Sequence, residues 1–212
     1  MDNSFPLPNS SLVNILTLRY DPSLKPNLPI KTSNDFEIND DIPDTEFIEK
    51  TICENIEQNL EKFTGEKISI ALSGGVDSTL ALSLIRKVKP DIEIEAISIK
   101  FADSVDETTA ASKIAHEFNA NHSILYLENY LSELPKAISM IKLPFWDLHW
   151  YYVVKKAKTF SNILISGDGG DELFSGYTFR YEKFLSLTSE NSTPLEKVKA
   201  YLECHERDRV SD

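Results

Sequence analysis

The stretch Lys67–Ser78, KISIALSGGVDS, decides the fold of this chain of 212 residues. Its first half is a short apolar run that contains two isoleucines, which predicts a buried strand. Two glycines end this strand, and a helix-forming run begins directly after them. The free N–H groups of such a turn and the dipole of the following helix favour an anion by about 0.3–1 kcal/mol. Ser73 and Ser78 add hydroxyl donors and Asp77 is placed to hold magnesium, so the stretch predicts a phosphate site.

Residues 73–78, SGGVDS, do not form the common GxxxxGK[ST] phosphate loop, because no lysine stands at the end of the turn. The pattern resembles the SGGxDS signature of the ATP pyrophosphatase, or PP-loop, superfamily. Members of that superfamily cleave ATP between the α- and β-phosphates and leave AMP on a substrate. An ordinary glycine turn before a helix is the alternative reading.

The rest of the chain alternates between helical and strand patterns. An amphipathic helix is predicted from Asp44, its cap, to Gly65, its stop. Further strands are predicted at 92–101, 123–127 and 162–166, and further helices at 106–118, 129–141, 147–160 and from about 194. This alternation predicts an α/β fold, a doubly wound parallel sheet with helices on both faces. Residues 1–43 are rich in proline and polar residues and predict an extended or poorly ordered segment, with a candidate strand at Leu12–Leu18.

The composition argues against several classes of protein. Lys and Arg number 22 against 34 Asp and Glu, and a net charge of −12 argues against a broad basic surface for nucleic acid. Cys53 and Cys204 form no metal or CxxC spacing, so a reducing compartment is expected. The amino terminus has no signal-peptide pattern, and no apolar run has the length of a membrane span. We therefore expect a cytoplasmic protein with no membrane or nucleic-acid partner.

A second unusual stretch, Ser166–Tyr177, reads SGDGGDELFSGY and directly follows a predicted strand. Its clustered carboxylates repel one another unless a cation or a set of donors holds them. Parallel strands end at one edge of a sheet, so Asp77 and Asp171 are expected to converge on one magnesium ion that bridges the phosphates of ATP. The alternative is a polar loop that caps the next helix, with Asp171 and Glu172 at its amino end.

Together the two motifs resemble the asparagine synthetase family, whose synthetase domain carries an SGGxDS turn and a later SGEGSDELFGGY or SGDGGDELFGGY block. The resemblance covers residues 66–182 and includes Asp106-Glu107 and Pro144 with Asp147. It implies the adenine nucleotide alpha hydrolase-like, or PP-loop, fold, with residues 44–212 as the synthetase domain.

The resemblance also implies roles for individual residues. Asp77 and Asp171 hold magnesium, and Asp168 takes the place of an acid, often a glutamate, that orients the acyl-adenylate and ammonia. The backbone near adenosine is that of Leu72, Ile99 and Gly167, with Ser166 beside them. The residues assigned to pyrophosphate are Ser73, Gly74, Gly75, Asp77 and Ser78.

The implied activity is that of an ATP-dependent, amide-forming ligase. The carboxylate of a substrate, for which aspartate is the leading candidate, attacks the α-phosphate of ATP and releases pyrophosphate. Ammonia then attacks the acyl-adenylate and gives the amide and AMP, as in asparagine biosynthesis. The family continues beyond Asp212, so we expect a chain truncated at its carboxyl end, without a later lysine that stabilises charge on the α-phosphate. Asp2 stands where a glutaminase would have its cysteine nucleophile, so nitrogen is expected from free ammonia or a separate glutaminase subunit. A homodimer is left open.

Two other functions remain open. One is a different adenylating PP-loop activity, such as tRNA thiolation or NAD synthesis, and the other is a truncated nucleotide-binding module without full catalysis. The histidines stand in no metal spacing, and we expect neither metal binding nor catalysis from them; they are His116, His122, His149 and His205. The aromatic residues around Trp150 are expected to serve mainly in core packing, although the resemblance implies that this region lines the substrate pocket.

Overall fold

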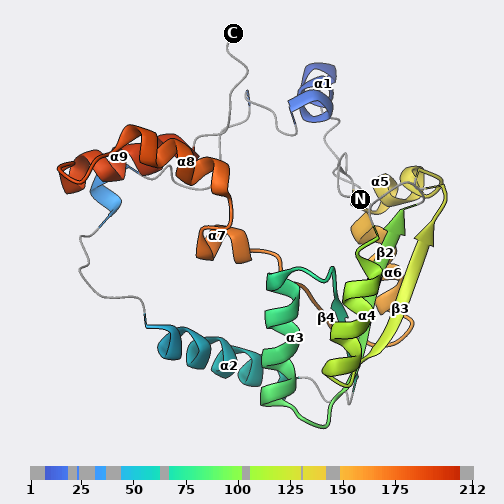
Figure 1. The fold of residues 1–212 in the computed structure, drawn as a ribbon. Helices are drawn as coiled ribbons and strands as arrows, with labels where there is room; N and C mark the ends of the chain where they lie inside the picture. Colours follow the sequence, from blue (N-terminus) through green and yellow to red (C-terminus); the bar gives the residue numbers. More distant parts are fainter. Residues whose placement is uncertain are drawn as a thin grey trace. The chain divides into compact units, whose positions relative to one another are not determined.

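A computed structural model describes residues 8–18, 23, 32–36, 44–62, 67–101, 106–129, 131–141 and 149–205 (Figure 1). Its contacts divide the chain into two compact units. The first consists of residues 1–23 and 45–168 and contains the sheet, and the second consists of residues 24–44 and 169–212. None of the described helices combines the length and the apolar character that crossing a bilayer requires.

Four parallel strands form the sheet of the first unit (Figure 1). They are β1 (Lys67–Ala71), β2 (Glu93–Phe101), β3 (Asn121–Leu127) and β4 (Leu164–Ile165), in the spatial order β3-β2-β1-β4. The order reverses between β1 and β4, which makes the space beyond their carboxyl ends the switch point where ligands of such sheets bind. The predicted parallel α/β sheet is confirmed.

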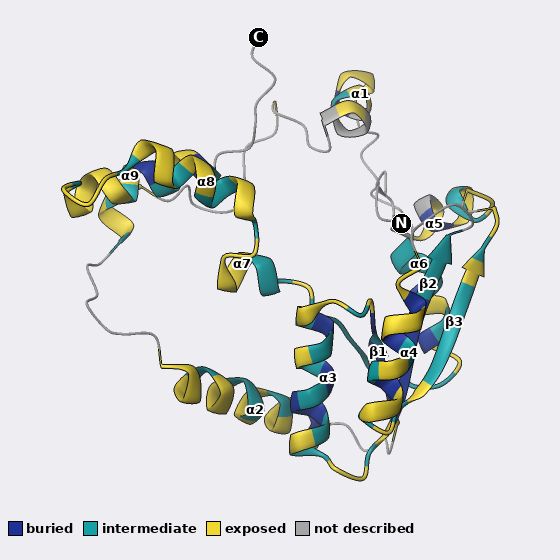
Figure 2. Ribbon diagram, viewed as in Figure 1, coloured by how far each residue is buried: buried dark blue, intermediate teal, exposed yellow. Residues whose placement is uncertain are grey.

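Helices cover both faces of this sheet. Ile68 and Ile70 of β1 and Ile94 of β2 pack on the face of α3 (Val76–Val88) and α4 (Thr108–Glu117), with α2 (Thr45–Glu61) reaching the same core. Ile97 of β2 packs on the opposite face, against Val153 of α6 (His149–Ala157). Figure 2 shows the buried residues concentrated in α3, α4 and the strands between them. Helices on both faces are therefore confirmed.

Several predicted elements are shorter in the structure. The helix predicted at 106 begins at Thr108, because the carboxylate of Asp106 accepts hydrogen bonds from the backbone N–H of Thr108 at 3.0 Å and from its hydroxyl at 2.5 Å. The helix predicted at 129 is α5 (Leu134–Ile141), whose start suits Pro135, since proline fits the first turn of a helix. Strand β4 keeps two of the five residues predicted for it. The predicted stop at Gly65 lies outside the described residues.

The candidate strand at Leu12–Leu18 is wrong, because this segment forms helix α1 (Asn9–Leu18). Leu12, Ile15 and Leu16 follow the helical spacing of three and four residues as well as they fit a short apolar strand. The hydroxyl of Thr17 donates to the carbonyl of Val13 at 2.7 Å, a bond between successive turns. Short apolar runs leave this choice undecided at the level of sequence.

The second unit contains the short helix η1 (Ser33–Asp35) and three α-helices, α7 (Gly170–Phe174), α8 (Thr178–Leu187) and α9 (Pro194–His205). The start of α9 near residue 194 is confirmed, whereas α8 was not predicted. The ring of Phe36, next to η1, meets the ring of Tyr201 edge-on at 5.9 Å. Ala200 and Cys204 are the buried residues of α9.

The loop after β4 lies directly against the first turn of α3. A Cβ atom at Gly167 would stand 2.7 Å from the backbone nitrogen of Ser78 and 2.8 Å from the carbonyl carbon of Asp77. These are backbone atoms of a regular helix, which cannot turn aside as a flexible side chain can. Glycine is therefore required where the two segments cross.

We predict that Gly167→Ala lowers the free energy of unfolding by about 3 kcal/mol, because the added methyl forces the loop away from α3. Urea denaturation measures this loss. Hydrogen exchange should also rise in the first turn of α3, where the Thr79 amide donates to the Gly75 carbonyl at 3.1 Å.

The control is Gly169→Ala, where the added Cβ meets nothing within 4 Å and only the positive φ of 93° is strained. This change should cost about 1–2 kcal/mol and leave exchange in α3 as in the wild type. Unchanged exchange in α3 with Gly167→Ala would contradict the contact.

Candidate functional site

A cavity of about 390 Å³ opens at the carboxyl ends of β1, β2 and β4, within the first unit. Its volume lies in the range of small-molecule sites. Most of the residues singled out in the sequence line this one cavity, namely Leu72, Ser73, Asp77, Ser78, Ile99, Ser166, Gly167 and Asp168. The structure thus brings together the first motif and the beginning of the second.

The glycine turn between β1 and α3 has the conformation that a close approach of backbones requires. Gly74 has a φ of +83°, and a Cβ there would stand 3.2 Å from the backbone nitrogen of Ala111 in α4. Gly75 is the N-cap of α3 and has extended backbone angles. The turn therefore rests on α4 and leads straight into the amino end of α3.

Serine hydroxyls hold the turn in this shape. Ser73 Oγ accepts from the Gly75 amide at 3.2 Å and lies 3.1 Å from Ser78 Oγ. Ser78 is buried, donates to the Gly75 carbonyl at 3.2 Å, and accepts from the Ser73 amide at 3.3 Å. Ser78 thus braces the turn from inside, and the exposed Ser73 is the more accessible hydroxyl. A contact of either hydroxyl with a phosphate stays a prediction.

Asp77 stands in the first turn of α3 with its side chain half-buried at the cavity. Its carboxylate has no hydrogen bond or ion pair to another described residue. The described residues also contain no cluster of three or more metal-ligating side chains. Magnesium commonly binds one or two carboxylates together with substrate phosphates and water, so a single carboxylate beside a phosphate turn fits this ion.

Asp168 is exposed at the cavity, one residue after the crossing at Gly167. Its amide donates to Ser166 Oγ at 3.4 Å, which helps to turn the loop after β4. Asp77 and Asp168 therefore line one cavity, the first from the amino end of α3 and the second from the loop after β4.

Asp171 lies in α7, in the second unit, and its convergence with Asp77 stays a prediction. Within that unit Gly176 leaves room for the Asp171 carboxylate, since a Cβ at Gly176 would overlap with it. The hydroxyl of Tyr177 donates to Glu172 at 2.6 Å. This hydrogen bond lowers the pKa of Glu172 and raises the pKa of Tyr177, so Glu172 holds the end of α7 in place.

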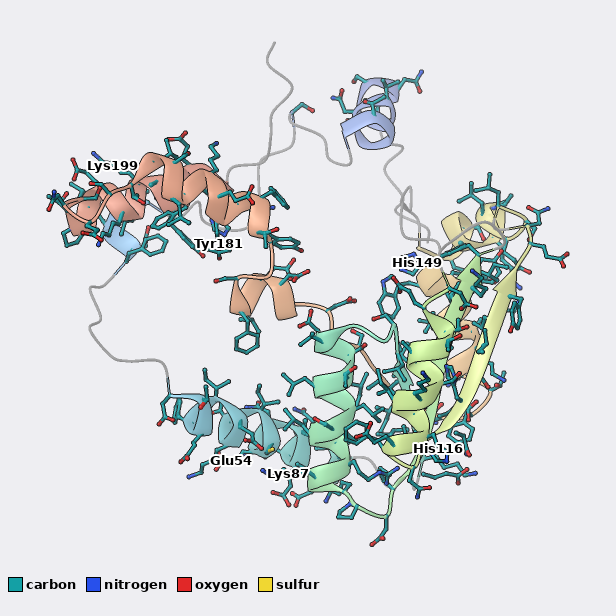
Figure 3. All side chains as sticks on the ribbon, in the orientation of Figure 1. Glu54, Lys87, His116, His149, Tyr181 and Lys199 are labelled. Carbon is teal, nitrogen blue, oxygen red and sulfur yellow. The ribbon has the colours of Figure 1, made fainter. Side chains whose placement is uncertain are left out.

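Three residues of α6 also form part of the cavity wall, in the region that the resemblance places at the substrate pocket. His149, Trp150 and Val153 line it from α6, and Figure 3 labels His149 at the start of that helix. Trp150 also packs against the core around Ile97, so the expected core role is confirmed and a place at the cavity is added to it. No spacing in the sequence shows which end of α6 meets the sheet edge.

Glu107 and Thr108 form another part of the wall, at the start of α4. A signal for them existed, because they follow β2 at the sheet edge where the two motifs were expected. In the sequence, Asp106-Glu107 stands out only through the family resemblance.

A model of the asparagine synthase family matches residues 61–209. The glutamine-hydrolyzing asparagine synthetase 1 of Bacillus subtilis (strain 168) is 31% identical over 139 residues, which are 62% of this chain and 20% of the relative. The corresponding enzyme of Gallus gallus is 26% identical over 131 residues, 53% of this chain and 22% of the relative. The chain thus spans about a fifth of the length of these curated relatives.

Solved structures with a related arrangement are more distant. The glutamine-dependent NAD+ synthetase of Acinetobacter baumannii, in complex with ADP, has a TM-score of 0.49 and 14% identity, covering 67% of this chain and 29% of that one. NMN synthetase from Francisella tularensis has a TM-score of 0.47 and 19% identity, covering 75% and 71%. The family assignment comes from the sequence match, which covers more than half of the chain and contains both motifs: the chain belongs to the asparagine synthase family.

Proposed function

We propose that this chain is an ATP-dependent, amide-forming ligase of the asparagine synthetase type. It adenylates the carboxylate of a substrate, with aspartate as the leading candidate, and releases pyrophosphate. Ammonia then converts the acyl-adenylate to the amide and AMP. One observation carries the proposal: the phosphate turn and the loop that bears Asp168 line a single cavity at the switch point of the sheet. Membership of the asparagine synthase family supports the same reaction.

The phosphates of ATP are proposed to lie over the glycine turn, against the amino end of α3. The first N–H groups of a helix have no partner within the helix and point toward such a ligand. Asp77, with Asp171, would hold magnesium, which supplies charge neutralisation on the phosphates when it is bound. The turn is already braced by Ser73 and Ser78, so little ordering accompanies binding.

Adenosine is proposed to lie beyond the turn, on the backbone of Leu72, Ile99 and Gly167 and beside Ser166. The side chains of Ile97 and Val153 line the same cavity and give the base an apolar wall. Such a mixture of apolar walls and a few fixed polar groups is the usual composition of a nucleotide site.

Asp168 is proposed to act in the second step. When ammonia attacks the acyl carbon, the nitrogen becomes positively charged and must lose a proton as the bond to AMP breaks. A carboxylate at the cavity stabilises that charge and accepts the proton. Asp168 is one methylene shorter than the glutamate found in many relatives, so its reach depends on how closely the loop after β4 approaches the substrate.

Residues 44–212 are the proposed synthetase domain, and the partners follow from the reaction. They are ATP, a small carboxylate, and either free ammonia or a separate glutaminase subunit, with a homodimer left open. The whole activity of the longer relatives is part of the proposal, because the chain spans about a fifth of their length.

The proposal predicts that the protein forms AMP and pyrophosphate from ATP only when magnesium and aspartate are present, and the amide when ammonia is added. Asp77→Asn should lower AMP formation about 100-fold or more, because the carboxylate that holds the cation is gone. Chromatography of the nucleotides and a pyrophosphate assay measure both products.

The matched control is Asp91→Asn, an exposed aspartate that precedes β2 at the opposite end of the sheet, and its activity should equal that of the wild type. If the protein binds ATP but forms no AMP under any of these conditions, it is a nucleotide-binding module and not a ligase. If it forms AMP at the same rate with and without aspartate, it is another adenylating PP-loop enzyme.

The shared magnesium site predicts that Asp77 and Asp171 are energetically coupled. Asp77→Asn and Asp171→Asn should each weaken the affinity for magnesium-ATP about tenfold, and the double variant should be little weaker than either single one. Isothermal titration with and without magnesium measures the three affinities. Glu172→Gln serves as the control, because Glu172 is bonded to Tyr177 and is not proposed as a ligand. If the losses of affinity are fully additive, the two aspartates do not bind the same ion.

A further inference from the structure

A line of hydrogen bonds crosses the interior of the first unit and ends at the residue before the phosphate turn. Ser112 Oγ of α4 lies 2.9 Å from His122 Nδ1 of β3. His122 Nε2 lies 2.8 Å from Ser98 Oγ of β2, and Ser98 Oγ donates to the carbonyl of Leu72 at 2.5 Å. Ser98 and Leu72 line the cavity, whereas His122 and Ser112 stand behind it.

The donor and the acceptor of each of these hydrogen bonds follow from the last one, in which the Leu72 carbonyl is the acceptor. A carbonyl only accepts, so the single hydroxyl proton of Ser98 points to Leu72. Ser98 Oγ must then accept from His122 Nε2–H, which either charge state of the ring can supply. Burial lowers the pKa of His122, with the Glu95 carboxylate acting in the opposite sense, and this favours the neutral ring, in which Nδ1 accepts from the hydroxyl of Ser112. His122 is thus a donor aimed at Ser98.

The peptide between Leu72 and Ser73 depends on side chains for its orientation. Strand β1 ends at Ala71, and the Leu72 amide still bonds to the carbonyl of Ile97 at 2.9 Å. The next peptide has left the ladder: its carbonyl oxygen accepts from Ser98, and its N–H donates to Ser78 Oγ at 3.3 Å. Two hydroxyls therefore set the plane of the peptide that opens the phosphate turn.

We propose that His122 is a positioning residue for the nucleotide site. By donating to Ser98 it selects the hydroxyl rotamer that binds the Leu72 carbonyl, and so it fixes the angle at which the chain enters the phosphate turn. The inference rests on the proposed ATP site. Helix α4 then holds the turn in two ways, directly where Gly74 meets Ala111 and indirectly through Ser112 and His122.

A partly buried histidine that serves stability alone would have the same contacts, and the two roles differ in what a substitution changes. Loss of a positioning residue weakens ATP binding beyond its effect on folding. Loss of a purely structural residue lowers stability and leaves the affinity of the folded protein unchanged. Affinity and stability must therefore be measured on the same variants.

The test compares His122→Ala with His122→Gln, whose side-chain amide retains a donor for Ser98. Affinity is measured by isothermal titration with ATP and magnesium, and stability by urea denaturation. His122→Ala should weaken ATP binding roughly three- to tenfold, and His122→Gln should stay within about twofold of the wild type. In a Ser98→Ala background, His122→Ala should cause no further loss of affinity.

The matched control is Ser69→Ala, a fully buried serine of β1 whose hydroxyl lies 3.1 Å from Ser161 Oγ, away from the cavity. It should lower stability and leave ATP affinity unchanged. If His122→Ala does not fold, Ser112→Ala removes only the bond between Ser112 and His122 and should weaken ATP binding about threefold, more than His122→Gln does.

Two results would overturn the inference in distinguishable ways. If the wild type binds ATP and His122→Ala binds it equally well while losing stability, His122 is structural and the ligase proposal stands. If the wild type does not bind ATP at all, the proposed function fails, and the positioning role fails with it.

Discussion

The contact between the loop after β4 and the first turn of α3 is the constraint on which the site depends. Strands β1 and β4 are parallel neighbours, so the segments that leave them begin side by side. Any side chain at Gly167 would collide with the backbone of α3, and glycine lets the two segments touch. This contact brings Asp168 to the cavity that Asp77 reaches from the helix. Without it, the two motifs would be neighbours in the sheet but would not form one site.

Hydroxyl groups satisfy much of the backbone of the phosphate turn. The Ser73 and Gly75 amides donate to serine hydroxyls, and other hydroxyls donate to the carbonyls of the turn. Thr79 and Ser78 donate to the Gly75 carbonyl, and Ser98 donates to the Leu72 carbonyl. The serine-rich character of the stretch is therefore a property of the turn itself, beyond any contact with a ligand.

The parts of the structure that were predicted correctly are those in which residue type alone sets the local geometry. The strand, glycine turn and helix of Lys67–Ser78 needed no knowledge of distant contacts, and the alternation of patterns was enough for a parallel sheet. The segment around Ile15 failed because its spacing fits a helix and a strand equally. The place of α6 at the cavity was implied only by the family resemblance, because which end of this helix meets the sheet edge is set by packing across the sheet. The role of His122 depends on pairing between β2 and β3, which no local pattern reveals.

The charge of the cavity explains why a cation belongs in the proposed reaction. Among the described residues that line the cavity there is no lysine or arginine, whereas Asp77, Glu107 and Asp168 are acidic. Like charges 4 Å apart repel by about 4 kcal/mol in a partly screened site, so several phosphates beside these acids would be expelled if helix dipoles acted alone. The dipole of α3 contributes about 1 kcal/mol or less. A divalent ion held by Asp77 would offset this repulsion, and Asp168, on the loop after β4, would remain free to act on the incoming nitrogen.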